Sequence, residues 1–156
     1  MHLRLIAVGD RQPGWVDEAF SSYVARFPAN WKFRLDSIPT GQRGQRKAAA
    51  SAVAEESGKM LQRLDRSDFV VALDEGGRQL SSDDLALRLQ RWQTGGRDLA
   101  FLIGGPDGLG PDCLGRADFC WSLSRVTLPH GLARILLVEQ LYRAWSINQN
   151  HPYHRC

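Results

Sequence analysis

The sequence has no apolar run that approaches the roughly 20 residues of a membrane-spanning helix. Its opening residues, Met1 to Ile6, begin a strand-like pattern and lack the layout of a signal peptide. Its three cysteines, Cys113, Cys120 and Cys156, are an odd number without CxxC spacing, which favours reduced thiols over a disulfide framework. We therefore expect a cytoplasmic protein with no membrane association.

The sequence also lacks repeats, low-complexity tracts and a strong excess of one charge. Its 156 residues are 43% hydrophobic and 24% charged, which predicts a single globular domain over residues 1–156. The net charge of +3 and the pI of about 9.0 permit a nucleic-acid partner without requiring one. Arg43, Arg46 and Lys47 lie in a Gly/Gln-rich segment without an acidic neighbour, so they are candidate phosphate contacts.

Strand-like and helix-like segments alternate along the chain. Strands are expected at 3–8, 31–38, 69–73, 99–103 and 119–123. Helices are expected at 15–27, 46–64, 112–117 and 132–147, and one more begins at a Ser81 or Ser82 cap and ends at Gly95-Gly96. This alternation predicts the α/β class, with a mostly parallel sheet and helices on both faces.

The segment Gly104-Gly-Pro-Asp-Gly-Leu-Gly110 follows a predicted buried strand and resembles a nucleotide-binding loop at first sight. Its glycines run G-x-x-G-x-G from Gly105 instead of G-x-G-x-x-G, and Pro106 removes a backbone donor. No G-K-[ST] sequence follows, so a flavodoxin-like or other phosphate-cradling protein is disfavoured. Two interpretations remain: a plain strand-to-helix turn, or a turn whose bare backbone lets an adenine or ribose approach.

A second candidate ligand loop follows the last predicted strand. The segment Leu123-Ser-Arg-Val-Thr-Leu-Pro129 carries little charge, and it is either a plain connection or a loop whose backbone grips a flat heterocycle. Beyond it, His130 and Arg134 share a helix face at i, i+4. Because Arg134 precedes an apolar stripe, it needs an anionic partner, which is Glu139, a ligand carboxylate or a phosphate.

The last predicted helix is apolar around most of its circumference, which is more than one sheet face requires. We therefore expect a homodimer in which one side of this helix packs on a second copy. The tail, His151-Pro-Tyr-His-Arg155, is either frayed or a set of side chains suited to stack on a base and move a proton. A metal site is disfavoured because the segment is short and the chain has no other ligand cluster.

Four motifs occur together and in order: Leu-Ile-Gly-Gly-Pro-x-Gly-Leu from Leu102, Trp-Ser-Leu-Ser-x-x-Thr-Leu-Pro-His from Trp121, Leu-Tyr-Arg-Ala-Trp-Ser-Ile from Leu141, and Asn-His-Pro-Tyr-His-Arg from Asn150. With them the chain resembles, over essentially its whole length, the bacterial ribosomal RNA large-subunit methyltransferase H family of the SPOUT superfamily. The resemblance implies an α/β fold with a C-terminal trefoil knot, a homodimer and S-adenosyl-L-methionine as cofactor. It also implies methylation of N3 of a pseudouridine in the helix 69 loop of 23S rRNA, on assembled ribosomes.

The resemblance places the cofactor in three strand-end loops, at Leu73, Gly105 and the run of Leu123, Ser124, Arg125, Val126, Thr127 and Leu128. Arg125 stands at a position that varies in the family, and Cys156 extends past the matching tail.

For catalysis we predict that His154, or otherwise His130, takes the N3 proton. Arg155 and Arg134 would hold a phosphate or a base carbonyl, and Tyr153 would stack on the base. The alternative to an enzyme is a ribosome-binding factor of the same fold that has lost the chemistry.

Overall fold

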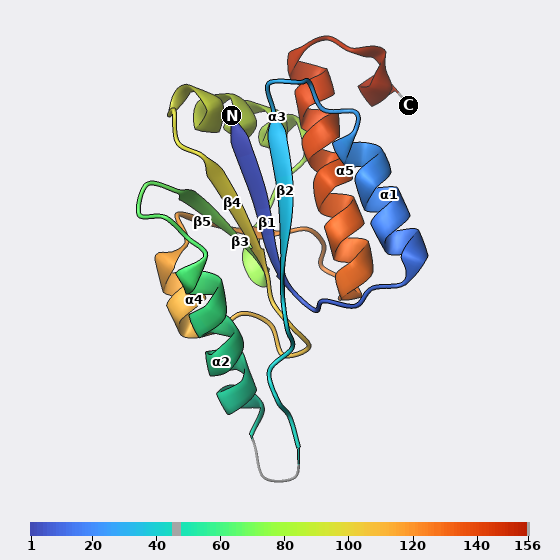
Figure 1. Cartoon of the computed structure of the whole chain (residues 1–156). Coiled ribbons are helices and arrows are strands. Elements are labelled where there is room, and N and C mark those ends of the chain that lie inside the picture. The colour runs from blue at the N-terminus through green and yellow to red at the C-terminus, as the bar shows by residue number, and fades with distance from the viewer. Residues whose placement is uncertain (45–47, 156) are drawn as a thin grey trace.

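The computed structural model describes residues 1–44 and 48–155 of the chain (Figure 1). Arg46 and Lys47, two of the candidate phosphate contacts, and Cys156 lie outside the described residues. The strands are β1 (His2–Val8), β2 (Lys32–Ile38), β3 (Phe69–Gln79), β4 (Leu99–Ile103) and β5 (Phe119–Ser122). The helices are α1 (Gly14–Val24), α2 (Ala49–Gln62), α3 (Ser82–Thr94), α4 (Pro111–Arg116) and α5 (His130–Asn148), followed by a 3-10 turn at Pro152–Arg155.

The described strands form one sheet in the order β2-β1-β4-β3-β5, and every neighbouring pair is parallel. The central strand, β4, is buried along its whole length, as its continuous apolar sequence predicts. Successive side chains of β1 point to opposite faces: Leu5 packs toward α1, α3 and α5, whereas Ile6 packs toward α2 and α4. Figure 1 shows the same two helical layers, so the α/β class with helices on both faces is confirmed. The trefoil knot stays a prediction.

Strand β3 is longer than the sequence indicates. Asp74-Glu-Gly-Gly77, which we expected as a turn, lies inside β3 as an irregular segment, and Leu73 and Arg78 on either side of it both pair with Trp121 of β5. A Cβ at Gly77 would lie 2.8 Å from main-chain atoms of Trp121, so the two strands approach too closely there for any side chain. Two consecutive glycines usually indicate the end of a strand. Here they lie within β3, where its main chain passes close to that of β5.

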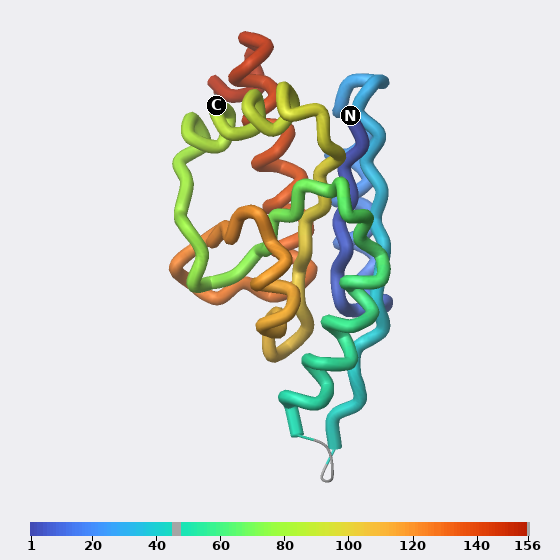
Figure 2. Tube along the Cα trace, turned by 90° about the vertical axis from the view of Figure 1, so that its left-hand side faces the viewer, coloured from blue at the N-terminus to red at the C-terminus, as the bar shows by residue number. Residues whose placement is uncertain are grey.

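The two ends of α5 lie at opposite ends of the sheet. The helix begins beside the carboxyl ends of the strands, after β5, and runs back toward their amino ends. After α5 the chain reverses at Asn150, whose φ of 53° is left-handed, and the tail folds onto the last turns of α5 and the end of α1. Figure 2 shows both chain termini at this same end of the molecule.

Candidate functional site

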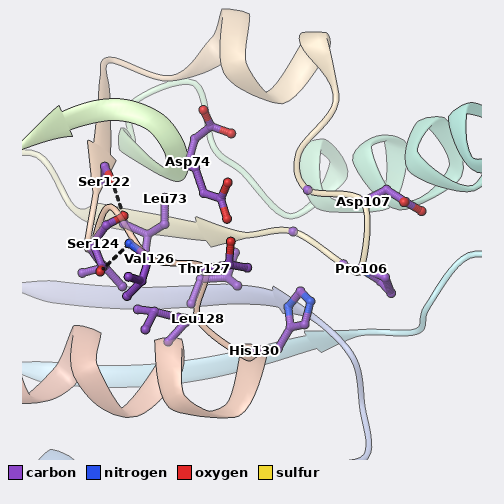
Figure 3. A pocket seen from close by; sticks show the side chains of 17 residues that line it. Leu73, Asp74, Pro106, Asp107, Ser122, Ser124, Val126, Thr127, Leu128 and His130 are labelled. Carbon is purple, nitrogen blue, oxygen red and sulfur yellow. Dashed lines mark hydrogen bonds between the residues drawn. The ribbon is translucent and has the colours of Figure 1, made fainter.

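A cavity of about 430 Å³ opens at the carboxyl edge of the sheet, where open α/β sheets bind their ligands. It is formed by the ends of β3, β4 and β5 and by the start of α5 (Figure 3). Its lining residues are 73–75, 103–108, 122–124 and 126–128, with His130 and Ala133. The volume falls within the range of small-molecule sites, and the wall combines apolar side chains with exposed main chain.

The glycine segment forms one wall of this cavity. A Cβ at Gly104 would lie 2.4 Å from the carbonyl carbon of Gly108, so the main chain folds tightly back on itself. The Gly108 N–H donates to the Gly105 carbonyl at 3.0 Å, and Gly108 has a left-handed φ of 79°. The interpretation as a tight turn is therefore confirmed. Because the same glycines line the cavity, the main chain is also open to a ligand, as the other interpretation requires.

The loop after β5 forms the facing wall and holds its shape through its own serines. The Ser122 Oγ donates to the Ser124 carbonyl, and the Val126 N–H donates to the Ser124 Oγ, each at 3.0 Å (Figure 3). Of the eight residues predicted to contact the cofactor, the cavity brings together Leu73, Gly105, Leu123, Ser124, Val126, Thr127 and Leu128. Arg125 is the member of this set that the described lining does not include.

Three acidic residues that sequence reasoning passed over also line the cavity. Asp74 and Glu75 come from the irregular segment of β3, and Asp107 comes from the glycine turn. Their position in the sequence could have identified them, because Asp74 and Glu75 directly follow a predicted buried strand and Asp107 lies in the glycine turn after another. Together they make this end of the molecule attractive to a cationic ligand.

The two residues predicted at the start of α5 have different environments. His130 lines the cavity (Figure 3). Arg134, one turn later, is only 2% exposed, and its Nη2 donates to the main-chain carbonyls of Val8, at 3.4 Å, and Gly9. Burial lowers the pKa of the Arg134 guanidinium, an effect that the charge of Asp17 opposes. Its Nε has no hydrogen-bond partner among the described residues.

Glu139, one of the anionic partners considered for Arg134, is engaged elsewhere. It accepts from the Arg143 Nη2 at 2.7 Å and from the Tyr153 hydroxyl at 2.9 Å. The structure therefore uses carbonyl oxygens of the loop after β1, rather than Glu139, to hold Arg134.

The tail is docked and not frayed. The Tyr153 ring packs edge-on against Tyr142, with centroids 4.7 Å apart, and the Arg143 guanidinium lies 5.1 Å from the centre of the Tyr153 ring. Burial, the Tyr23 hydroxyl and the Glu139 carboxylate all raise the pKa of Tyr153 above its ordinary value. His154 is placed more loosely, with its Nδ1 3.5 Å from the Ser146 Oγ, and Arg155 is exposed.

Within one chain, the tail and the cavity are far apart. Tyr153 reaches back to Glu139 near the middle of α5, but His154 contacts Ser146, which lies about 24 Å along the helix from His130 at about 1.5 Å per residue. The structure thus brings His130 to the cavity, whereas Tyr153, His154 and Arg155 gather at the other end of the helix.

Two general features of the described residues bear on the kind of site. No helix among them is both long and apolar enough to cross a membrane. Within residues 1–44 and 48–155, no three His, Cys, Asp or Glu side chains are grouped so that they could hold a metal ion.

A parallel sheet covered on both faces, with a glycine-walled cavity at its carboxyl edge, is the arrangement in which α/β proteins bind small molecules. Residues 1–154 match the family described as "Predicted SPOUT methyltransferase". The chain therefore belongs to the SPOUT methyltransferase family, and the methyltransferase class suggested by its motifs is confirmed.

Relatives of similar length support this assignment. The chain is 48% identical to the ribosomal RNA large subunit methyltransferase H of Thioalkalivibrio sulfidiphilus (strain HL-EbGR7), over 99% of each chain. It is 49% identical to the protein of the same name from Dichelobacter nodosus (strain VCS1703A), again over 99% of each. The identity with that of Marinomonas sp. (strain MWYL1) is 44%, over 99% of this chain and 100% of the relative.

Solved structures share the fold at low sequence identity. A probable methylase family protein from Haemophilus influenzae Rd KW20 matches with a TM-score of 0.58 and 12% identity, over 97% of this chain and 69% of that one. A putative methylase family protein from Neisseria gonorrhoeae matches with a TM-score of 0.50 and 13% identity, over 90% and 81%. These likenesses bear on the fold alone.

Proposed function

We propose that the protein uses S-adenosyl-L-methionine to methylate N3 of a pseudouridine in the helix 69 loop of 23S rRNA, on assembled ribosomes. The observation that carries the proposal is the convergence of three strand-end loops on one cavity, in a chain 44–49% identical to proteins named ribosomal RNA large subunit methyltransferase H. A cytoplasmic location follows from this substrate.

The cavity suits this cofactor chemically. Leu73, Ile103 and Leu128 offer apolar surface to an adenine ring, and the bare main chain of the glycine turn offers hydrogen-bonding groups. Asp74 and Glu75 place negative charge where a sulfonium and an ammonium group need it. When bound, S-adenosyl-L-methionine supplies an activated methyl group, so the protein has to orient the acceptor and help to remove its proton.

A homodimer fits the distance between the tail and the cavity. If His154 and Arg155 act in the reaction, they have to reach the cavity of a second copy, because His154 contacts Ser146, about 24 Å along α5 from His130 at their own cavity. A symmetric dimer with α5 packed antiparallel against its partner would bring each tail to the other cavity.

Exposed apolar side chains lie where such a dimer would form. Leu132 and Leu136, at the start of α5, are 40% and 37% exposed, and Val126 on the cavity loop is 68% exposed. Trp15 is 56% exposed on α1, beside Val16, which packs against Gly131 of α5. Burial of these exposed apolar side chains against a second copy would favour the dimer.

Proton removal is assigned to the imidazoles. The N3 imide is mostly protonated at neutral pH, so a base or donors to its flanking carbonyls lower the barrier. We propose His154 of a second copy as the acceptor, with His130 of the same chain as the alternative. Arg155 then contacts a phosphate or a base carbonyl. Tyr153 anchors the tail through its ring and hydroxyl, and a base that stacks on it has to compete with Arg26 and Arg143, whose guanidiniums lie over the ring.

The experiment is transfer of a labelled methyl group from S-adenosyl-L-methionine to ribosomes with and without the helix 69 pseudouridines, with cofactor binding followed by calorimetry. We expect transfer to the complete ribosomes and a loss of about a hundredfold in His154→Ala, with parental cofactor affinity.

Cofactor binding without transfer to any ribosome would reject the proposed substrate. Ribosome binding without cofactor binding would instead support a non-enzymatic factor of the same fold. If His154→Ala and Arg155→Ala both methylate like the parent, the tail has no catalytic role.

A further inference from the structure

Arg43, which the sequence suggested as a phosphate contact, is committed to two carboxylates of its own chain. It lies in the loop between β2 and α2, and its side chain is 24% exposed. Its Nη1 and Nη2 donate to the two oxygens of Glu56, at 2.9 and 3.2 Å, and its Nε donates to Asp107 at 2.8 Å. The guanidinium therefore bridges α2 and the glycine turn of the cavity.

Glu56 is a buried charge that the proposed reaction does not use. It is 2% exposed on α2, and besides Arg43 it accepts from the Gly41 N–H at 2.8 Å. A Cβ at Gly105 would lie 2.9 Å from both oxygens of Glu56, so the carboxylate packs directly behind the cavity wall. A buried carboxylate in this position is tolerated because Arg43 and Gly41 satisfy it.

The next residue of α2 holds the far end of the same turn. The Gly110 N–H donates to the Ser57 Oγ at 3.3 Å, and a Cβ at Gly110 would lie 2.5 Å from that oxygen. Consecutive residues of one helix thus support the turn from Gly105 to Gly110 from behind, on the side away from the cavity.

We propose that Arg43 and Glu56 act as a clamp that positions the glycine turn for S-adenosyl-L-methionine. Neither residue belongs to the described cavity lining, so both are positioning residues that act through Gly105 and Asp107. The inference rests on the proposed function, because it takes the cavity to be the cofactor site.

The direction of the Asp107 side chain supports this role. Figure 3 shows its carboxylate pointing away from Thr127 and His130, and it is there that Arg43 binds it. Without the guanidinium, Glu56 and Asp107 would leave two like charges on either side of a tight turn. The turn would then move, and the main chain presented to the cofactor would move with it. The loss of a hydrogen bond between this main chain and the cofactor is enough to weaken binding by about tenfold.

The experiment compares Arg43→Met, Glu56→Gln and the double variant with the parent protein. We expect Arg43→Met to raise the dissociation constant and the KM for S-adenosyl-L-methionine about tenfold. The kcat at saturating cofactor should stay within about twofold, because the reacting groups are unchanged. The dissociation constant of Arg43→Lys should lie between those of the parent and of Arg43→Met, since lysine keeps the positive charge but cannot donate to both carboxylates at once as the guanidinium does. The double variant should bind no worse than Arg43→Met, because both residues act through one contact.

Lys59→Met is the matched control, since Lys59 pairs with Glu55 on the exposed side of the same helix. It should leave affinity unchanged. If Arg43→Met is unstable because Glu56 is left unpaired, the double variant carries the test, since it buries no unpaired carboxylate. If Arg43→Met or the double variant is folded and its dissociation constant for the cofactor is within twofold of the parental value, the proposed clamp is wrong.

A second readout separates this inference from the proposed function. Hydrogen exchange of the Gly108 amide, which donates to Gly105, should quicken in Arg43→Met and not in Lys59→Met. If the parent binds no S-adenosyl-L-methionine, the proposed function fails, and the clamp is then judged by this exchange alone. Unchanged exchange would refute the clamp whatever the cofactor.

Discussion

The two ends of α5 are held in place by different means. At the cavity end, the shape is that of the main chain: the glycine turn folds on itself, and the hydroxyls of Ser122 and Ser124 hydrogen-bond to the backbone of their own loop. At the tail end, the shape comes from side chains, as Tyr153 meets Tyr142 and Glu139. Substitutions at the first end act through the path of the main chain, whereas those at the second end remove contacts between side chains directly.

The two ends also differ in charge. Asp74 and Glu75 bring negative charge to the cavity, where Asp107 is paired with Arg43, whereas the tail carries the guanidinium of Arg155. Opposite charge at opposite ends of one helix is complementary when two copies lie antiparallel. The difference in charge therefore supports a site formed by the cavity of one chain and the tail of another, which the following experiments test.

Mixing two inactive proteins gives the largest expected effect. Gly104→Ala distorts the turn that walls the cavity, because its Cβ would lie 2.4 Å from the Gly108 carbonyl carbon, and deletion of residues 151–156 removes the tail. Each variant alone should show no transfer. In an equal mixture half of the dimers are mixed and each holds one intact site, so activity should return to about a quarter of the parental value.

Gly115→Ala, a change in α4 with open space around the glycine, is the control for Gly104→Ala. Far-ultraviolet circular dichroism has to show that both inactive variants are folded. A folded, exchanging mixture that stays inactive would mean that the cavity and the tail do not cooperate across two chains.

Replacement of Arg134 tests the cavity end. Arg134→Met leaves the Val8 and Gly9 carbonyls without their donor but also removes a desolvated cation. The hydrogen bonds from this charged donor stabilise the fold by more than the burial of the cation destabilises it. We therefore expect a net loss of about 2 kcal/mol in the free energy of unfolding. Denaturant titration measures it, with Arg91→Met on the exposed face of α3 as the control. A variant as stable as the parent would show that the loop after β1 does not need this anchor.

Replacement of Tyr153 tests the tail end with a smaller effect. Tyr153→Phe keeps the packing on Tyr142 and loses the hydrogen bond to Glu139, which should cost about 1 kcal/mol. The pKa of Tyr153 is raised in the folded protein, so its contribution is complete below the ordinary tyrosine pKa of about 10 and is lost as pH rises beyond it.

The difference in stability between parent and Tyr153→Phe should accordingly be constant from pH 7 to 9 and shrink above about pH 10. Unfolding in urea at a series of pH values measures this difference. A difference that grows with pH would contradict the assigned environment of the phenol.

The sequence predicted the parts of the fold that depend on local pattern. Continuous apolar runs marked the buried strands, and a cap at Ser81 or Ser82 marked the start of α3. The structure uses Ser81, which forms both hydrogen bonds of a capping box with Asp84. Local pattern failed at Asp74-Glu-Gly-Gly77. Its glycines satisfy the rule for a turn, but Gly77 serves a close approach to β5 that only tertiary structure creates.

The sequence predicted the cavity lining at positions that the family resemblance identifies as cofactor contacts. Leu73, Gly105 and the loop after β5 meet at one cavity because the carboxyl ends of parallel strands share an edge. Arg43 was not predictable in this way. A basic residue in a glycine-rich loop is typical of a phosphate contact, and its carboxylate partners lie 13 and 64 residues away in sequence.

Helix α5 is one unbroken helix that connects the cavity to the docked tail. Its length therefore determines where the tail lies relative to the cavity. One inserted residue would turn everything beyond it by about 100° and lengthen the helix by about 1.5 Å. The tail would then face a different direction from the cavity-end residues that begin the same helix. In α5 the number of residues therefore carries as much information as their identity.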